Sequence, residues 1–356
     1  MTDTIATHAG VQNVLDATVA AGVAPGYAAA VRQGNTTWFG AAGVSDTDIR
    51  APRRPEQRFR IGSTTKTFTA TVLLTLVGEG ALGLDDPVES WLPGILDGTG
   101  VTIRHLLQQT SGLFNYVLDE KLLADYVGPA FLAHRDDTFT PERLVGIALA
   151  HPPLFAPGAG WSYSNTNYIL AGMIIERVTG HAYAAEVADR IAGPLGLTST
   201  YVPGDETGID GPHPRLYSKL MLPGPDAPVH DVTELNPSHG WAAGGMISTL
   251  EDLNQFFAAL LGGLLLPPDL HREMFTGIST DGGGWIPDTT YGLGVYSQRL
   301  PSGTTVWGHG GAIHGSWSYV MGSIGGSHLL AQSINGDWTT LDVFARALDA
   351  EFGSLT

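Results

Sequence analysis

The chain carries the segment FRIGSTTKTFTATVLLTLVGEG at residues 59–80. Apolar residues lie on nearly all sides of a helix drawn over 64–79, so this helix is predicted to be buried. Gly80 follows and is expected to end it. Ser63 stands at the start of this helix, and Lys66 lies three residues later on the same face.

The pair Ser63 and Lys66 suits nucleophilic catalysis. A serine hydroxyl is a poor nucleophile until a neighbouring group takes its proton. A lysine can take that proton only if burial or a nearby cation lowers its pKa, and the apolar helix would supply the burial. Free N–H groups at the helix start would stabilise a developing oxyanion. Taken alone, however, Ser-x-x-Lys is a common pattern, and its ordinary explanation is a surface lysine with a capping serine.

A second motif, Tyr163-Ser164-Asn165, comes just before a predicted helix. A phenol beside a lysine ammonium can ionise and then serve as base and acid. The amide of Asn165 can hold both Lys66 and a substrate carbonyl. The alternative for this motif is a simple capping turn.

A third motif, His309-Gly310-Gly311, lies on a strand that begins at Trp307. A glycine-rich strand lets a substrate backbone approach as an added strand. Its N–H groups can complete an oxyanion hole with the N–H of Ser63. The alternative is a glycine turn without function.

Together with their surroundings, these motifs resemble those of the serine DD-peptidases and class C β-lactamases, and most closely the secreted DD-carboxypeptidase and D-aminopeptidase/esterase branch. The resemblance covers most of the chain and is carried by the segments 59–80, 84–88, 92–94, 102–107, 110–113, 156–158, 163–168, 171–172, 243–249, 252–253 and 307–311. It implies an α/β fold: a roughly five-stranded antiparallel sheet flanked by helices, plus an inserted mainly helical domain.

The same resemblance implies a role for each motif residue. Ser63 would form the acyl-enzyme, and Lys66 and Tyr163 would share proton transfer. Asn165 would bind the substrate amide, and His309 would orient the Tyr163 proton or the leaving group. The oxyanion hole would consist of the backbone N–H groups of Ser63 and Ala312.

Strand patterns occur towards both ends of the chain, and helical patterns occupy the middle. Strands are predicted at 27–31, 36–42, 291–298, 304–308, 316–321 and 329–334. Helices are predicted at 11–21, 102–109, 141–150, 166–179, 184–192, 250–261 and 339–352, and 201–238 is expected to be a long irregular loop. Residues 1–80 and 285–356 would form the α/β domain and 81–284 the helical domain, with the active site in the cleft between them.

Two departures from the DD-carboxypeptidases bear on the substrate. That branch typically has His-Thr-Gly-Thr where this chain has His309-Gly310-Gly311-Ala312. Its carboxylate-binding arginine corresponds to Tyr296, although Arg299 is close enough for a one-residue bulge to bring it in. A carboxylate needs charge-assisted donors. The sequence therefore favours esters, amides or thioester-linked acyl groups that lack a free C-terminal carboxylate.

Aromatic residues near these motifs are candidates for an acyl pocket, with core packing as the alternative for each. They are Trp241, Trp285, Tyr296 and Trp307. His314 lies five residues after His309, which places the two on opposite faces of a regular strand. A structural or rim position is therefore expected for His314.

Composition narrows the function classes. The net charge of −17 disfavours nucleic acids and anionic membranes as partners. The absence of cysteine excludes disulfides and thiolate catalysis, no metal-binding spacing occurs, and no cofactor is expected. Neither a signal peptide nor a membrane span is recognised, so a cytoplasmic location is expected, or an extracellular one if the chain is a trimmed mature form.

The leading hypothesis is a serine hydrolase or acyltransferase that acts on a small-molecule or peptide acyl substrate, with an amine as one conceivable acceptor. Relatives of this kind include esterases, amidases, D-aminopeptidases and transacylases of specialised metabolism. The first alternative is a D-Ala-D-Ala carboxypeptidase or penicillin-binding protein. The second is a catalytically silent binding domain.

Overall fold

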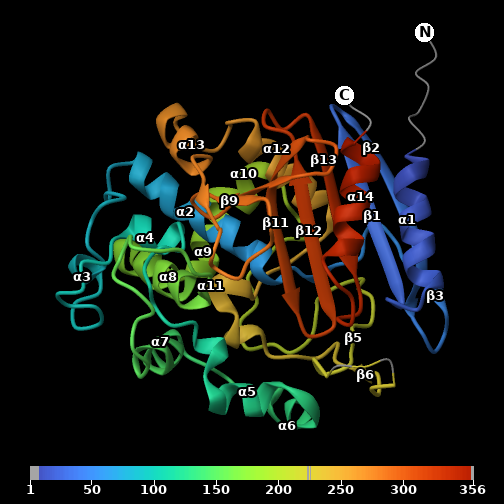
Figure 1. Ribbon diagram of the computed structural model, residues 1–356, viewed down its shortest axis with the longest axis horizontal. Helices are drawn as coiled ribbons and strands as arrows, with labels where there is room; N and C mark the ends of the chain where they lie inside the picture. Colours follow the sequence, from blue (N-terminus) through green and yellow to red (C-terminus); the bar gives the residue numbers. More distant parts are fainter. Residues whose placement is uncertain (1–7, 223, 225, 354–356) are drawn as a thin grey trace.

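The computed structural model describes residues 8–222, 224 and 226–353, and its main feature is a large antiparallel sheet (Figure 1). The sheet has nine strands within these residues, in the order β3-β2-β1-β13-β12-β11-β10-β9-β8. Five strands have seven residues or more: β1 (Gly26–Gln33), β2 (Thr36–Asp46), β11 (Thr305–Ile313), β12 (Ser316–Gly322) and β13 (His328–Ile334).

The predicted fold class is confirmed, but the sheet is wider than predicted. The four additional strands have two to four residues: β3 (Ala51–Pro52), β8 (Ile278–Ser279), β9 (Thr289–Tyr291) and β10 (Tyr296–Arg299). Segments this short do not show the two-residue alternation by which a strand is recognised.

The single strand predicted over 291–298 is wrong. The chain turns back between β9 and β10, and Tyr296 pairs with Tyr291 across the resulting hairpin. Gly292 donates its backbone N–H to Val295 O, and Gly294 has a φ of +80°. A Cβ atom on Gly294 would lie 2.4 Å from the Cβ of Ala70. The turn can therefore approach the helix that contains Ala70 only with glycine at position 294.

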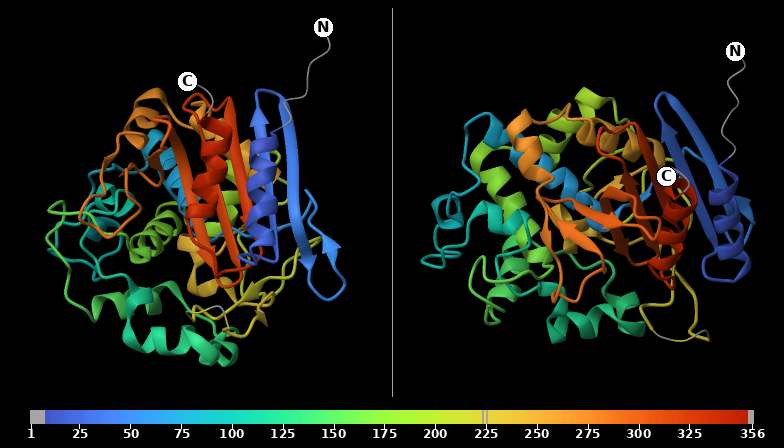
Figure 2. Two further views of the ribbon diagram at one scale, coloured as in Figure 1. Left: turned by 45° about the vertical axis from the view of Figure 1, so that its right-hand side comes forward. Right: turned by 45° about the horizontal axis from the view of Figure 1, so that its top comes forward.

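The two ends of the chain meet in the sheet, where β1 pairs with β13. Helices α1 (Ala9–Ala20) and α14 (Asp342–Phe352) cover one face, as both views in Figure 2 show. On β1, Tyr27, Ala29 and Val31 pack in the core on this face, and the alternate residues face the opposite core. On that opposite side α12 (Leu250–Leu261) packs against β1, β12 and β13.

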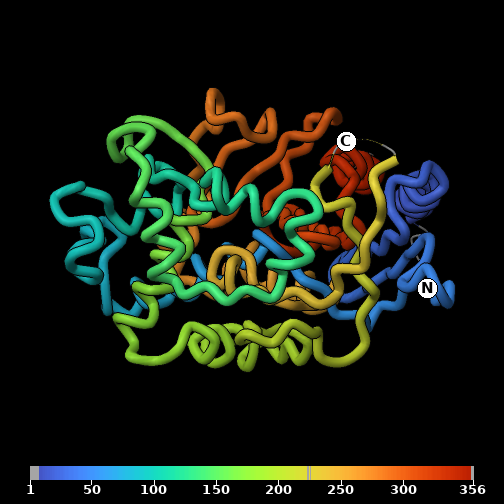
Figure 3. The backbone as a smooth tube through the Cα atoms, turned by 90° about the horizontal axis from the view of Figure 1, so that it is seen from below, coloured from blue at the N-terminus to red at the C-terminus, as the bar shows by residue number. Residues whose placement is uncertain are grey.

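Helices dominate the remaining part of the molecule. The view from below in Figure 3 shows much of this part, in cyan and green, at the end away from both termini. Predicted helices are confirmed as α4 (Ile103–Leu107), α7 (Pro141–Leu149), α8 (Asn165–Thr179) and α9 (Tyr183–Val187), which continues as a π-helical turn at Ala188–Ala192. Short helices that were not predicted are α3 (Val88–Trp91), α5 (Glu120–Tyr126), α6 (Phe131–His134), α10 (Gly193–Leu195), α11 (Trp241–Gly244) and α13 (Pro268–Met274). The proposed domain limits at 80 and 285 stay a prediction.

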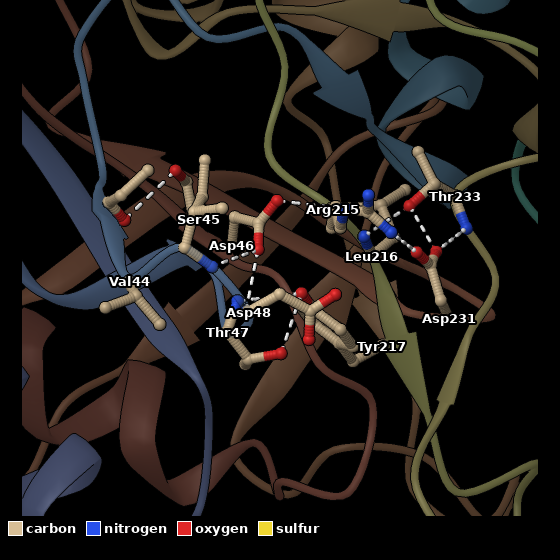
Figure 4. A network of polar contacts seen from close by, with 12 residues as sticks. Val44, Ser45, Asp46, Thr47, Asp48, Arg215, Leu216, Tyr217, Asp231 and Thr233 are labelled. Atoms are coloured by element: carbon tan, nitrogen blue, oxygen red, sulfur yellow. Dashed lines mark hydrogen bonds and ion pairs between the residues drawn. The ribbon is translucent and has the colours of Figure 1, made fainter.

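The long segment predicted as a loop over 201–238 is tied to the sheet by a polar network (Figure 4). It contains two-residue strands, β5 (Tyr217–Ser218) and β6 (His230–Asp231), which pair with each other. Arg215 bonds to Asp46 on β2 at 2.9 Å and to Asp231 at 2.6 Å. These bonds fix the loop against the edge of the sheet.

Helix length bears on membrane association. In the part of the chain that the structure describes, no helix combines the length and the apolar character needed to cross a membrane. The expectation about a signal peptide concerns the first part of the chain, of which residues 1–7 lie outside the described residues.

Candidate active site

Ser63 lies in a 3-10 turn, η1 (Gly62–Thr64), which leads directly into helix α2 (Thr65–Gly78). Gly62 has a φ of +51°, and a Cβ there would lie 2.6 Å from the backbone nitrogen of Ala312. Glycine at 62 is therefore required by the backbone conformation and by the close approach of strand β11.

Gly311 makes the same contact from the strand. A Cβ at this position would lie 2.0 Å from Ile61 O and 2.6 Å from the backbone nitrogen of Ser63. Ser318 Oγ donates a hydrogen bond to Ile61 O at 2.7 Å and holds the turn against the sheet. The two glycines thus bring the backbone nitrogens of Ser63 and Ala312 to one small region, where an oxyanion hole was predicted.

Lys66 is completely buried and faces three oxygen atoms. Its Nζ lies 2.9 Å from Ser63 Oγ, 2.6 Å from Asn165 Oδ1 and 2.7 Å from the carbonyl oxygen of Ala243. Burial holds the pKa of Lys66 well below its ordinary value. A neutral amine can donate to the two carbonyl-type oxygens and still direct its lone pair at the Ser63 hydroxyl.

Asn165 and Tyr163 come from the start of α8, where Ser164 is the residue preceding the helix. The backbone N–H of Asn165 donates to Asn115 Oδ1 at 3.1 Å, which fixes this corner. The Tyr163 ring centroid is 4.8 Å from Lys66 Nζ, and the ring stacks on Trp285 at 4.4 Å.

The Tyr163 hydroxyl is enclosed and has no hydrogen-bond partner of good geometry among the described residues. Burial raises the pKa of Tyr163 well above its usual value, while the neighbouring Ser63 hydroxyl acts in the opposite direction. The phenol is therefore protonated at neutral pH. Of the two candidate bases, Lys66 is the one whose pKa the site lowers.

The structure shows the contacts of His309. Its side chain is buried and lines neither cavity beside Ser63. Nδ1 lies 2.6 Å from Gly310 O, and Nε2 lies 3.1 Å from Tyr291 Oη. Because a carbonyl only accepts, Nδ1 carries the hydrogen and Nε2 accepts from Tyr291. Burial, and next the charge that Lys66 would carry when protonated, lower the pKa of His309 to about 3. His309 thus bonds to its own strand and to Tyr291, and it belongs to the lining of neither cavity.

A first cavity of about 330 Å³, cavity 1, opens beside Ser63, Asn165 and Ala312. Most of its wall is apolar and comes from Val117, Leu118, Leu122, Leu123, Val127 and Ile313. His239 and His314 also line it. The described lining contains no lysine, arginine, aspartate or glutamate.

A second cavity of about 540 Å³, cavity 2, lies on the side of Ser63 that Tyr163 occupies. Gly310, Gly311 and Ala312 border it. Its aromatic wall comes from Tyr163, Trp285, Tyr296, Trp317 and Tyr319. No charged side chain belongs to this lining within the described residues.

Two predicted pocket residues are placed elsewhere. Trp241 lies against Tyr183 at a ring distance of 5.3 Å and packs beside Gly172 of α8. Trp307 packs against Phe275 at 5.4 Å. Neither lines cavity 1 or cavity 2, so the alternative of core packing applies to both. Both tryptophans are half-buried and pack against the main hydrophobic core.

Arg299 does not replace the missing arginine. Strands β10 and β11 pair without a register shift, with Tyr296 opposite Gly308 and Arg299 opposite Thr305. Arg299 is exposed at the end of β10, and the bulge that would bring it to the site is absent from this pairing.

Several residues at the site were not assigned from the sequence. Ala243 contributes its carbonyl to Lys66, Asn115 orients Asn165, and Tyr291 bonds to His309. The residues of cavity 1 between Tyr116 and Val127 also lacked a recognisable pattern. Among these residues, only Tyr291 was suggested by the sequence, as the first residue of the strand predicted over 291–298. The hairpin that orients Tyr291 was not predicted.

Comparisons with known proteins show the family and the fold of the chain. The family model described as beta-lactamase matches residues 11–326. A D-stereospecific amidohydrolase from Streptomyces sp. has 47% sequence identity and a TM-score of 0.89, over 97% of this chain and 98% of that chain. A D-amino acid amidase from Ochrobactrum anthropi SV3 has 30% identity and a TM-score of 0.82, over 98% and 99% of the two chains.

Curated relatives match over shorter spans. Esterase EstB of Burkholderia gladioli is 39% identical over 173 residues, which cover 47% of this chain and 44% of the esterase. Penicillin-binding protein 4* of Bacillus subtilis is 28% identical over 308 residues, which cover 80% of this chain and 62% of that protein. The matches therefore span less than two thirds of either relative. The family match identifies the chain as a member of the β-lactamase family, and its esterase and amidase relatives support a serine hydrolase of that type.

Proposed function

We propose that this protein cleaves amides or esters of D-amino acids through an acyl-enzyme on Ser63, and that its leaving groups carry no free carboxylate. The observation that carries this proposal is cavity 2. It adjoins Tyr163, is walled by aromatic rings, and has no cation in its described lining. The names of the amidohydrolase and amidase relatives support the D-configuration.

The first step follows from the state of Lys66. In the resting enzyme its neutral amine donates to Asn165 Oδ1 and Ala243 O and accepts from the Ser63 hydroxyl. As Ser63 Oγ bonds to the acyl carbon, its proton passes to Lys66. The carbonyl oxygen becomes negative and is held by the backbone N–H groups of Ser63 and Ala312.

The second step assigns the two cavities. The C–N or C–O bond breaks when the departing atom receives a proton, and the protonated Tyr163 phenol is the acid that faces cavity 2. Lys66 then returns its proton to Tyr163. The leaving group therefore occupies cavity 2, and the acyl group occupies cavity 1 beside Asn165.

The described lining of cavity 2 contains no cationic side chain, and this argues against a free carboxylate in the leaving group. Burying an ionised carboxylate against aromatic rings without a charge-assisted donor is unfavourable. Tyr296 stands where an arginine would be needed, and Arg299 is exposed at the end of its strand. The D-Ala-D-Ala carboxypeptidase alternative is therefore disfavoured.

The test is to incubate the protein with the D- and L-forms of phenylalanine amide and of phenylalanine methyl ester. We expect faster release of product from the D-forms and a transient acyl adduct on Ser63 by mass spectrometry. Ser63→Ala should abolish both turnover and the adduct, whereas Ser327→Ala, which changes an exposed serine in a distant turn, should abolish neither. Turnover that survives Ser63→Ala, or equal rates for D- and L-forms, would contradict the proposal.

A further inference from the structure

Cavity 1 contains two imidazoles in an otherwise largely apolar wall, and their hydrogen bonds define which nitrogens carry hydrogen. His314 Nε2 lies 2.9 Å from the carbonyl oxygen of Tyr126. Because that oxygen only accepts, Nε2 is the protonated nitrogen. Burial lowers the pKa of His314 to about 4, so the ring is neutral and its Nδ1 is a lone-pair acceptor.

His239 has the mirror-image arrangement. Its Nδ1 lies 3.1 Å from the carbonyl oxygen of Asn236, so Nδ1 carries the hydrogen and Nε2 is the acceptor. Burial, and next the charge that His314 would carry, lower the pKa of His239 to about 4. Tyr126 lies near both rings, at centroid distances of 5.2 Å to His239 and 6.4 Å to His314.

Both acceptor nitrogens lack a partner within the described residues. Neither nitrogen is completely enclosed by protein atoms, so each is accessible from open space. Both side chains line cavity 1. The nearby phenols do not supply the missing hydrogen. Tyr116 Oη donates to His239 O, and Tyr126 Oη donates to His134 O. This end of the cavity therefore offers lone pairs without matching donors.

We propose that the acyl part of the substrate carries an N–H or O–H donor that binds in cavity 1 to His239 or His314. This inference rests on the proposed function and specifies its substrate class. The donor is either the α-ammonium group or a donor at the end of an otherwise apolar side chain, such as a phenol. An acyl group that ends in a carboxylate would face two lone pairs and should be rejected.

The experiment uses four methyl esters that separate the two sources of the donor. They are the esters of D-phenylalanine, D-tyrosine, 3-phenylpropionic acid and 3-(4-hydroxyphenyl)propionic acid. Values of kcat/KM are divided by the rate of hydroxide-catalysed hydrolysis of each ester, because an α-ammonium group also activates the ester chemically. We expect one donor, the amine or the phenol, to raise the corrected kcat/KM about tenfold, the size of one hydrogen bond.

Variants of the two histidines test whether the imidazoles cause this increase in corrected kcat/KM. The rings of Phe131 and His314 are stacked with their centroids 3.7 Å apart. His314→Phe keeps a ring that can stack on Phe131 but removes the acceptor nitrogen. His239→Phe removes the other acceptor. The variant that removes the acceptor used by the donor should bring the fold increase in corrected kcat/KM that the donor causes close to one. His213→Phe is the matched control, because His213 also bonds to a backbone carbonyl but is exposed and lies outside cavity 1.

Equal corrected rates for all four esters in the unmodified protein would overturn the inference, and so would an increase in corrected kcat/KM that both histidine variants retain. The ester series decides the question even if a variant fails to fold. Failure of the proposed function looks different, because then none of the four esters would form an acyl adduct on Ser63.

Discussion

Tyr291 Oη lies 3.1 Å from His309 Nε2, and both side chains are buried. The opposite ring nitrogen of His309 donates to Gly310 O, so the pair fixes the peptide that precedes Gly311. Tyr291 also contacts Tyr163 edge to face at a centroid distance of 6.4 Å. This arrangement makes His309 a positioning residue that acts through the backbone of β11.

Removal of the Tyr291 hydroxyl should therefore have a moderate effect. Tyr291→Phe keeps the ring and loses one hydrogen bond, so we expect kcat/KM to fall by less than about tenfold. Acylation and hydrolysis should both slow, and the pH profile should keep its shape. A drop of a hundredfold or a new ionisation in the profile would instead assign proton transfer to the Tyr291–His309 pair.

Activity should be far more sensitive to substitutions of Lys66 and Tyr163. We expect Lys66→Ala and Tyr163→Phe each to lower kcat by about a hundredfold or more, as for loss of a general base or acid. Lys66→Arg should be equally damaging, because a guanidinium stays charged and cannot accept the Ser63 proton. Steady-state kinetics of correctly folded variants provides the measurement, and near-normal kcat in either Lys66→Ala or Tyr163→Phe would refute the relay.

The pH dependence of kcat/KM should report Lys66 in the free enzyme. Burial lowers the pKa of Lys66, so the active neutral form persists below the ordinary lysine range and is lost as pH falls through that lowered value. We therefore expect an acid limb well below the ordinary lysine range, followed by a plateau that includes neutral pH. Activity that first rises only near pH 10 would show that Lys66 is charged in the resting enzyme and that another group is the base.

Gly311 should tolerate no side chain. A Cβ would lie 2.0 Å from Ile61 O and 2.6 Å from the Ser63 nitrogen, so Gly311→Ala must separate β11 from the nucleophile turn. We expect loss of acylation with far-ultraviolet circular dichroism unchanged. Gly146→Ala is the matched control, since this helical glycine has open space at its Cβ, and should stabilise the protein by up to about 1 kcal/mol. Full activity of Gly311→Ala would disprove the predicted oxyanion geometry.

The charge of the leaving group should control substrate choice. A peptide with a free C-terminal carboxylate should be cleaved at least about tenfold more slowly than its methyl ester, because cavity 2 lacks a charged donor. Adding an uncharged amine should divert part of the product from acid to amide, since cavity 2 can hold an amine after the leaving group departs. Comparing kcat/KM for the two peptides and the product ratio at increasing amine concentration checks both points. Equal cleavage of the two peptides would restore the carboxypeptidase alternative.

The sequence by itself determined the local parts of this protein. The segment 59–80 predicted the buried helix with Ser63 and Lys66 on one face, because three-residue spacing and apolar character are local properties. The long strands and helices were recognisable for the same reason. The family resemblance then supplied the fold and the grouping of the three motifs.

Only the tertiary structure decided the environment of each group. The three oxygen partners of Lys66 come from residues 63, 165 and 243, which no local pattern connects. The sequence could not distinguish whether His309 faces a substrate or Tyr291, because a hairpin of short strands orients the tyrosine. Trp241 and Trp307 look equally suited to a pocket and to a core until their neighbours are known. Burial, pKa and hydrogen-bond direction depend on contacts between distant segments, and these contacts form only when the chain folds.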